Sequence, residues 1–390
     1  MYKICKRCVM DTSDAEITFD TNGFCNHCNE AIATLSTAVL HGEKARQALS
    51  GMVDKLHAAG KGNPYDCLIG LSGGVDSSYL AYKCKEWNLR PLLFHVDGGW
   101  NTPQSEHNVQ AIADYLGYPL KRYVVNWDEM RDLQRAFLLS GVPNQDIPQD
   151  HLFFAVLFGI AKKYNISYWL CGFNYISESI LPQSWGGYAM DALHLTAIHQ
   201  RFGSRELKTY PILPLEDYRR YYLKIGKQDI TRIDPLNFMT YNPLAARQEL
   251  AEKCGWQDYG SKHGESVFTR FFQNYFLPAR FGYDKRRAHL SSLIVSQCIS
   301  REQALAQLEE PLYNPRQLEE DKSAILSKLC FTEEEFASIM CLPLHKHTDY
   351  PTSIDHMTKK DKLYSQFKTF YRLTKEGNFS EIIQKVKNKF

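Results

Sequence analysis

The sequence predicts an α/β protein built on a parallel β-sheet with helices on both faces. The main observation is an alternation of short apolar segments with segments of helical periodicity through the first half of the chain. Parallel strands need long crossover connections, and helices of about 10–15 residues provide them. Two further features indicate where the candidate binding sites lie on this fold: a glycine-serine turn and two cysteine pairs near the N-terminus.

The apolar segments predict four strands, at residues 65–71, 91–97, 121–125 and 167–171, of which the first is expected to be buried. The periodic segments between them predict helices at residues 77–87, 104–116 and 151–164. One more helix is expected at residues 31–59, until a glycine- and proline-containing stretch interrupts the pattern. Residues 181–240 are rich in aromatic residues and proline, and we expect them to form an insertion or substrate-facing loops.

Composition and charge limit the possible function classes. The 390 residues include 46 basic and 44 acidic side chains, and a net charge of +2 gives no general attraction for nucleic acid. No window approaches the roughly 20 apolar residues of a membrane span, and the first residues lack an apolar signal core. We therefore expect a cytoplasmic protein, in which the 11 cysteines are thiols or metal ligands instead of disulfides.

The strongest motif is the turn at residues 72–78, which follows a predicted strand and opens a predicted helix. A helix N-terminus offers unpaired N–H groups and a partial positive charge to phosphate. The two glycines allow a close backbone approach, the serines add hydroxyl donors, and Asp76 is a candidate Mg²⁺ ligand and catalytic residue. The expected phosphate-binding residues are Ser72, Gly73, Gly74, Asp76, Ser77 and Ser78. A plain Gly-Gly turn is the simpler alternative, but the serines and the aspartate make it less favoured.

This turn is neither a Walker A motif, because no lysine follows the glycines, nor a G-x-G-x-x-G fingerprint. It resembles the SGGxDS signature of the PP-loop ATP pyrophosphatases. That resemblance implies a HUP-like parallel sheet, cleavage of ATP between the α and β phosphates, and adenylation of a substrate oxygen. It also implies that the adenosine lies near His95, Val96 and Asp97 at the end of the second strand, and near Gly172 and Asn174 after a later one.

Four cysteines near the N-terminus form two C-x₂-C pairs, Cys5 with Cys8 and Cys25 with Cys28. Their spacing fits the pattern of a tetrahedral Zn²⁺ site, and four thiolates would make that zinc structural. An iron–sulfur cluster is the main alternative, because it accepts the same ligands. His27 lies between the last two cysteines and could replace one of them.

Cationic residues at 260–295 are candidates for holding ATP phosphates or an anionic sugar nucleotide. Lys262 and Lys285 are the preferred phosphate ligands and candidate catalytic residues, although a solvated helix surface is an equally good interpretation of each charge. Cys171 lacks the small residue that precedes a glutaminase nucleophile, so we interpret it as a core residue of the pocket. Any glutaminase would then be a separate subunit.

In combination, the cysteine quartet, the 70–78 turn, residues 174–178 and residues 262–292 resemble the N-acetyl sugar amidotransferases. This family makes acetamidino sugars for lipopolysaccharide O-antigen and for nonulosonic acids such as pseudaminic or legionaminic acid. The resemblance implies that ATP adenylates an acetamido oxygen and that ammonia then displaces AMP. It also implies two partners that deliver ammonia, a histidine-biosynthesis-type glutaminase and a cyclase-like subunit.

Four regions are expected on this basis: residues 1–30 as a zinc-ribbon-like site, 31–62 as a helical linker, 63–240 as the PP-loop domain, and 241–390 as a mostly helical region that contributes to the substrate site. Two other functions remain open at this point. A tRNA thiolation enzyme also combines a PP-loop with metal-binding cysteines, but it needs a basic surface. A zinc-ribbon interaction protein with an inactive nucleotide fold would not need Ser72, Asp76 and Ser77.

Overall fold

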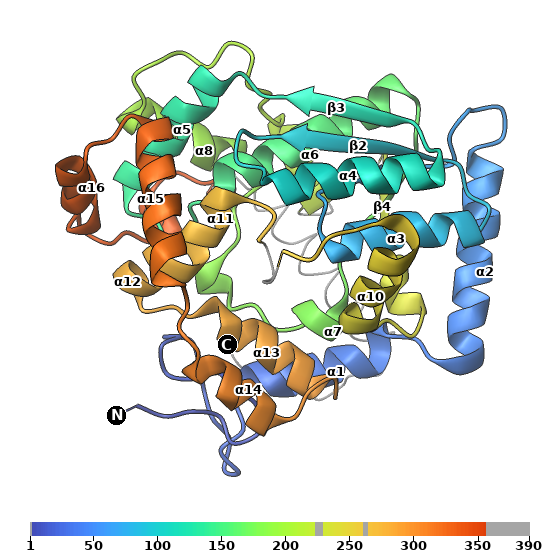
Figure 1. Ribbon diagram of the computed structural model, residues 1–390, viewed down its shortest axis with the longest axis horizontal. Coiled ribbons are helices and arrows are strands. Elements are labelled where there is room, and N and C mark those ends of the chain that lie inside the picture. Colours follow the sequence, from blue (N-terminus) through green and yellow to red (C-terminus); the bar gives the residue numbers. More distant parts are fainter. Residues whose placement is uncertain (1, 223–228, 260–263, 356–390) are drawn as a thin grey trace.

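A five-stranded parallel sheet forms the centre of the molecule in the computed structural model, which describes residues 2–222, 229–259 and 264–355 (Figure 1). The strand order is β3-β2-β1-β4-β5, and all neighbouring strands are parallel. The strands are β1 (Cys67–Gly70), β2 (Pro91–Asp97), β3 (Leu120–Val124), β4 (Tyr168–Leu170) and β5 (Thr231–Ile233). The first four coincide with the predicted strands, and the predicted α/β class is confirmed.

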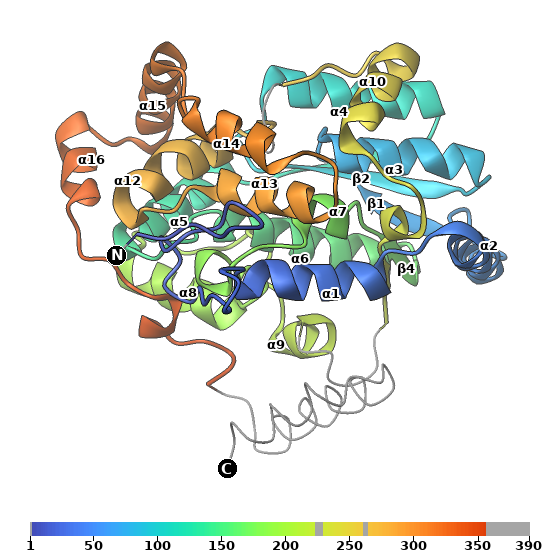
Figure 2. The same ribbon diagram turned by 90° about the horizontal axis from the view of Figure 1, so that it is seen from below.

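One face of the sheet is covered by α3 (Val75–Glu86), α4 (Pro103–Leu116) and α10 (Pro243–Cys254), and α2 (Gly42–Ala59) packs into the same core from the end where the strands begin. Figure 2 shows α3, α4 and α10 together on this side. Alternate strand residues such as Ile69 and Leu93 point into this layer, where they pack with Leu80 and Ile112. The burial of these apolar side chains is what attaches the helices to the sheet.

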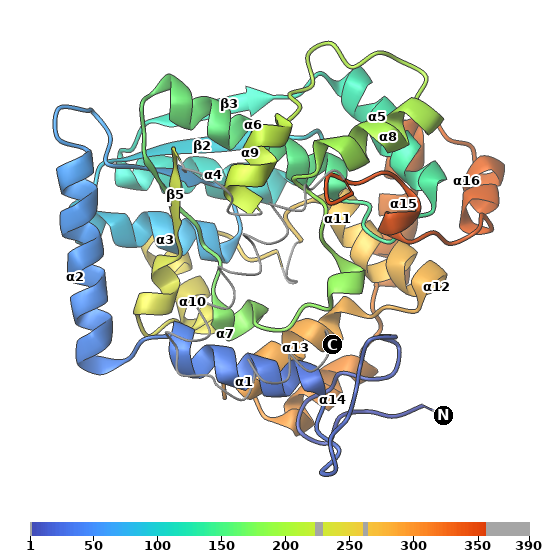
Figure 3. The same cartoon turned by 180° about the vertical axis from the view of Figure 1, so that it is seen from behind.

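The opposite face is covered by α5 (Trp127–Ser140), α6 (Ile147–Lys163) and α8 (Ala192–Phe202). Leu68 and Phe94, the neighbours in sequence of the residues that face the first layer, pack here against Phe137 and Leu152. Helix α5 was not predicted. Strand β5, labelled in Figure 3, was also missed, because it lies inside the stretch interpreted as loops and its sequence, Thr-Arg-Ile, is no apolar segment. It pairs with β4.

Helices from both ends of the chain complete the molecule beside the sheet. In Figure 2, α1 (Asn26–Ala38), α7 (Tyr175–Glu178), α13 (Lys285–Val295) and α14 (Arg301–Glu309) lie together. The single helix expected at 31–59 was wrong: α1 and α2 are separate, because Val39 is in an extended conformation with φ −94° and ψ 117°. The other α-helices are α9 (Leu215–Asp217), α11 (Val267–Phe271), α12 (Leu277–Phe281), α15 (Pro315–Leu329) and α16 (Glu333–Met340).

Short helical turns occupy Gln183–Trp185, Tyr218–Tyr222, Pro235–Phe238, Phe272–Phe276 and His347–Asp349. The described part of the C-terminal region is mostly helical, as predicted. None of the helices in the described ranges combines the length and the apolar character needed to cross a lipid bilayer.

Candidate functional site

The predicted turn lies where the direction of the strand order changes. β1 pairs with β2 on one side and with β4 on the other. The connection after β1 leads toward β2, and the connection after β4 leads toward β5, so these two connections run in opposite directions along the sheet. Ligands of open α/β sheets bind at the carboxyl ends of the strands beside such a point. Residues 72–78 follow β1, and residues 172–174 follow β4. Two segments predicted separately from the sequence therefore meet at this edge of the sheet.

Gly172 allows these two segments to approach closely. A Cβ atom at this position would lie 2.9 Å from the backbone carbon of Asp76 and 3.0 Å from the backbone nitrogen of Ser77. Contacts this short with backbone atoms cannot be relieved by a side-chain rotation. The exit of β4 therefore fixes the position of the first turn of α3.

Side chains of neighbouring segments donate hydrogen bonds to two backbone carbonyl groups of the turn, those of Ser72 and Gly73. Gly73 has φ +86°, and a Cβ atom there would lie 2.6 Å from the carbonyl oxygen of Ser105. The hydroxyl of Ser105 donates to the Ser72 carbonyl at 2.8 Å, and the indole of Trp256 donates to the Gly73 carbonyl at 2.9 Å. Asn108 donates to the same Gly73 oxygen at 3.2 Å. This side of the turn is thus occupied by protein donors, which sets the orientation of its peptide groups.

Two of the predicted hydroxyl groups lie side by side at the turn. The Oγ atoms of Ser72 and Ser77 are 3.2 Å apart, and the Gly74 N–H donates to the Ser72 hydroxyl at 3.2 Å. Helix α3 begins directly after Gly74, so its partial positive charge is directed at the same place. Ser78 lies one residue further along, fully buried in the first turn of the helix.

Asp76 is held by two side chains that come from distant parts of the chain. Asn174 donates to its Oδ1 atom at 3.2 Å, and the hydroxyl of Tyr241 donates to the same oxygen. Burial and the negative charge of Asp76 raise the pKa of Tyr241, so the phenol remains a hydrogen-bond donor. Asn174 is itself buried, and it caps α7 by accepting the N–H of Ser177 at 2.9 Å. The carboxylate is therefore fixed in direction beside the turn.

Two more residues at the turn were not predicted from the sequence. The N–H of Val75 donates to the hydroxyl of Tyr259 at 3.3 Å. The Oε1 atom of Glu265 lies 3.2 Å from the position that a Cβ atom at Gly74 would occupy. Glu265 lies within the 262–292 segment of the family resemblance but was not singled out there, whereas Tyr241 and Tyr259 belong to none of the segments that carry it. The fold brings all three to the turn.

The three residues at the end of β2 that were predicted to lie near the adenosine each have a different set of contacts. The Nδ1 atom of His95 donates to the Leu71 carbonyl at 2.7 Å, so this ring joins β2 to the start of the turn. The other ring nitrogen lies 2.9 Å from Glu106. Val96 is buried in the core, and Asp97 accepts the N–H of Gly99 at 2.7 Å.

Glu106 anchors this end of β2 electrostatically. Burial alone would raise the pKa of Glu106, but its hydrogen bonds with His95 and Asn101 outweigh burial and lower the pKa. Arg122 pairs with the second carboxylate oxygen at 2.7 Å. The carboxylate therefore stays ionised and holds α4 against the strands.

The other predicted residues can be placed only in part. Lys262 lies outside the described residues. Lys285 begins α13, and its charge acts on the carboxylates of Asp146 and Asp150. Burial raises the pKa of Cys171 to about 12, so its thiol is protonated at neutral pH, as expected for a core residue and not for a nucleophile.

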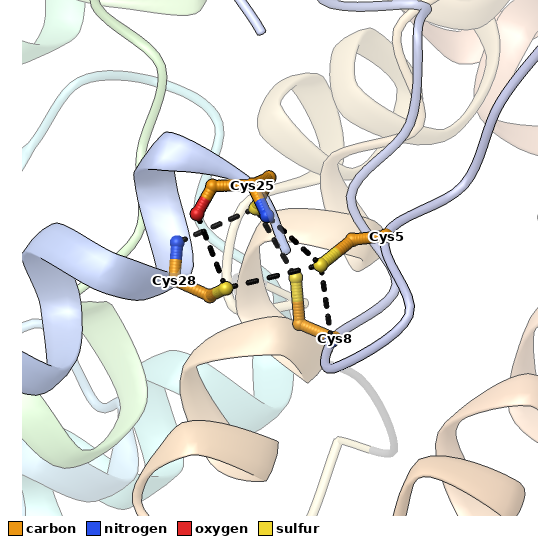
Figure 4. A group of neighbouring side chains, drawn as sticks. All are labelled: Cys5, Cys8, Cys25 and Cys28. Atoms are coloured by element: carbon orange, nitrogen blue, oxygen red, sulfur yellow. Dashed lines mark hydrogen bonds between the residues drawn. The ribbon is translucent and has the colours of Figure 1, made fainter. Parts of the chain in front are cut away.

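The four N-terminal cysteines come together in a buried cluster (Figure 4). Their sulfur atoms all lie within 4.8 Å of one another, with 3.8 Å between Cys5 and Cys28 and 3.6 Å between Cys8 and Cys25. Four sulfurs at about 2.3 Å from a tetrahedral Zn²⁺ would be about 3.8 Å apart. The residues present therefore fit a metal ion. His27 pairs instead with Asp14 at 2.5 Å.

Arginine side chains join the cysteine cluster to the C-terminal helices. Arg301 donates to the carbonyl groups of Cys5 and Cys8, both at 3.1 Å. Arg287 on α13 donates to the carbonyl of Val9 at 2.9 Å. Loss of the cluster would therefore disturb α13, the helix that begins with Lys285.

Comparison with known proteins agrees with this description. Residues 265–364 match the family described as "LPS biosynthesis protein WbpG-like, C-terminal domain". An NH(3)-dependent NAD(+) synthetase of Carboxydothermus hydrogenoformans is 28% identical over 134 residues, which are 34% of this chain and 52% of the relative. The chain thus spans about half the length of that relative. These matches bear out the predicted resemblance to PP-loop amidotransferases linked to lipopolysaccharide.

Two solved structures are also similar to parts of the chain. One is the NH3-dependent NAD synthetase from Campylobacter jejuni, with 14% identity, a TM-score of 0.31, and coverage of 73% of this chain and 94% of that chain. The other is the NMN synthetase from Francisella tularensis, with 19% identity, a TM-score of 0.27, and coverage of 35% and 57%.

The substitution Gly172→Ala tests the close approach between the turn and β4. The added methyl must displace the backbone at Asp76 and Ser77, and overpacking of this kind costs about 1–3 kcal/mol. We expect weaker binding of a non-hydrolysable ATP analogue by calorimetry, together with a lower free energy of unfolding in urea. Gly159→Ala is the matched control, because nothing lies within 4 Å of its Cβ position in α6, and it should leave nucleotide binding unchanged.

The substitution Cys25→Ser tests the metal site. We expect elemental analysis to find zinc in the wild-type protein and to find it lost in the variant, with a lower melting temperature because the link to α13 is weakened. Cys341→Ser, at an exposed cysteine, should keep the metal. Full metal content in Cys25→Ser would contradict the assignment of the metal site. Iron and acid-labile sulfide in the wild-type protein would show that the cysteines hold an iron–sulfur cluster instead of zinc.

Proposed function

We propose that this protein is an ATP-dependent amidotransferase that converts the acetamido group of an N-acetyl sugar into an acetamidino group, with release of AMP and pyrophosphate. The observation that carries the proposal is the turn at residues 72–78. It combines a helix N-terminus, two adjacent serine hydroxyls and the oriented carboxylate of Asp76 at the point where the strand order changes direction. The match to an NH(3)-dependent NAD(+) synthetase supports a reaction that consumes ammonia.

In this proposal, the turn holds the outer phosphates of ATP. The N–H groups at the start of α3 and the hydroxyls of Ser72 and Ser77 would bind the pyrophosphate, which leaves the α-phosphorus open to attack. Asp76 would hold Mg²⁺, which neutralises phosphate charge when bound. Tyr241 and Asn174 keep this carboxylate in place throughout the reaction.

The chemistry follows from the weakness of an amide as an electrophile. Its oxygen is a poor leaving group, but after adenylation the oxygen leaves with AMP. Ammonia then attacks the carbon, and the nitrogen takes the place of the oxygen. Water would compete at this carbon and restore the amide, so the site must exclude it.

The lipopolysaccharide description of the matched C-terminal family supports a sugar of a surface polysaccharide as the substrate. Pseudaminic or legionaminic acid precursors belong to the same chemical class. Because Cys171 is not an activated thiol, we propose that ammonia comes from a separate glutaminase of the histidine-biosynthesis type with a cyclase-like subunit. The cysteine cluster would hold a structural Zn²⁺ ion.

The test is incubation of the full chain with ATP, Mg²⁺, ammonium chloride and a panel of N-acetyl sugars and their nucleotide esters. We expect AMP, pyrophosphate and a sugar product in which mass spectrometry finds one oxygen exchanged for NH. Asp76→Asn should lower the rate on the order of 10²-fold, the effect typical of losing one preorganised electrostatic group.

Asp54→Asn, at an exposed aspartate of α2, is the control and should retain the wild-type rate. Production of ADP instead of AMP would contradict the proposed reaction. ATP turnover that requires tRNA and does not respond to any sugar would favour the alternative function, a tRNA thiolation enzyme.

A further inference from the structure

A second group of polar side chains lies at the start of α6, outside the turn. Asp146 precedes the helix, and Asp150 lies one turn further along. The N-terminus of α6 is at the carboxyl edge of the sheet, because the helix leads back to the beginning of β4. A Cβ atom at Gly98, just after β2, would lie 3.7 Å from Gln149 of this helix. The group therefore faces the same edge as the candidate nucleotide site.

Hydrogen bonds connect this group to the segment that covers the turn. Asp146 accepts from Gln149 at 3.0 Å and from Thr269 of α11 at 3.1 Å. Ser266, the residue that caps α11, donates to Gln149 at 3.4 Å. Ser266 directly follows Glu265, the carboxylate beside Gly74. The segment that lies beside Gly74 is thus joined to Asp146 by hydrogen bonds through Ser266, Gln149 and Thr269.

Asp150 differs from its neighbour in its contacts. Asp146 is 7% exposed and hydrogen-bonded, whereas Asp150 is surrounded by protein yet remains partly exposed. Within the described ranges of the chain, the Asp150 carboxylate makes no hydrogen bond. An ionised carboxylate in such surroundings needs a donor, and the accessible side of Asp150 leaves room for one from a ligand.

Charged groups from several elements face Asp150. These are Asp146 on the same helix, Lys285 at the start of α13, and Tyr210, whose hydroxyl donates to the Pro148 carbonyl at 2.6 Å. Burial and the charge of Asp146 raise the pKa of Asp150, and Lys285 opposes this shift. His151 is turned away, because its ring donates to the Ala189 carbonyl at 2.8 Å. Figure 3 labels the three helices involved, α6, α11 and α13.

We propose that Asp150, with Asp146 and Lys285 as positioning residues, is the base that accepts a proton from the ammonia nitrogen as it attacks the adenylated sugar. This inference rests on the proposed function. The nitrogen lone pair forms the C–N bond, and one N–H proton passes to the carboxylate of Asp150. The C–O bond to AMP then breaks, and its electron pair leaves on the AMP oxygen. The products are AMP, the amidine and a protonated Asp150, which later releases its proton to solvent.

The structure favours a proton acceptor over a simple sugar ligand for two reasons. The carboxylate has no hydrogen-bond partner among the residues that the structure describes, so it is available to an N–H donor. Its raised pKa also brings it closer to neutral pH, where a group can both accept and release a proton. Lys285 limits this shift, because a lysine charge favours the ionised form.

Asp150→Asn tests the role by separating the two half-reactions. Adenylation without ammonia is followed by exchange of labelled pyrophosphate into ATP in the presence of the same N-acetyl sugar panel. Amidine formation is followed with ammonium chloride. We expect the variant to retain exchange and to lose amidine formation by about 10²–10⁴-fold, the range for removal of a general base. Asp150→Glu should recover part of the rate, and Asp54→Asn should behave as wild type.

The acid limb of the pH–rate profile gives a second measurement within this test. Amidine formation should rise with pH as Asp150 loses its proton. Asp146→Asn removes a neighbouring negative charge, so the pKa of Asp150 should fall and the acid limb should move to lower pH. An unmoved limb would show that Asp150 is not the titrating base.

Equal loss of both half-reactions in a folded Asp150→Asn protein would overturn the inference, and so would unchanged amidine formation. A third result would also overturn the inference: the variant loses pyrophosphate exchange, and Mg²⁺ binds tightly to the wild-type protein but not to the variant. Asp150 would then be a metal ligand. Failure of the proposed function looks different, because wild type would then show no sugar-dependent exchange, and the inference would fall with it.

Discussion

The close approach of the exit of β4 to the first turn of α3 is the contact on which the site depends. It is possible because Gly172 has no side chain, and it sets the position of Asp76 and Ser77 relative to the sheet. Asn174, two residues later, then reaches the Asp76 carboxylate. A single backbone contact therefore positions the turn, the start of the helix and a charged group in one step.

The N- and C-terminal parts of the chain support this site from outside the sheet. The cysteine cluster is fastened to α13 through Arg287, and α13 contacts the Ser177 carbonyl through His289 at 3.0 Å. Ser177 lies in α7, whose first turn is capped by Asn174. A chain of contacts thus leads from the cluster to Asp76. A change at the cysteine cluster can therefore reach the Asp76 carboxylate through protein contacts alone.

The sequence predicted what local patterns control. Strands β1 to β4, the turn and the cysteine pairs each follow from spacing and residue type within a short segment. The tyrosines at 241 and 259 could not be found in this way, because only the crossover geometry brings them to residues 75–76. Strand β5 has a charged residue, Arg232, at its centre and no apolar segment around it, and it forms because β4 offers an open edge. The break between α1 and α2 combines a local and a distant contribution: Gly42 has φ +57°, and the Leu40 N–H donates to the Asn237 carbonyl at 2.9 Å.

The most direct test of the central claim is a crystal structure of the full chain with a non-hydrolysable ATP analogue and Mg²⁺. The account predicts the outer phosphates against the start of α3, within hydrogen-bond distance of Ser72 and Ser77, with the metal beside Asp76 and the α-phosphorus open toward the sugar site. An empty turn, with the nucleotide bound elsewhere on the molecule, would contradict it.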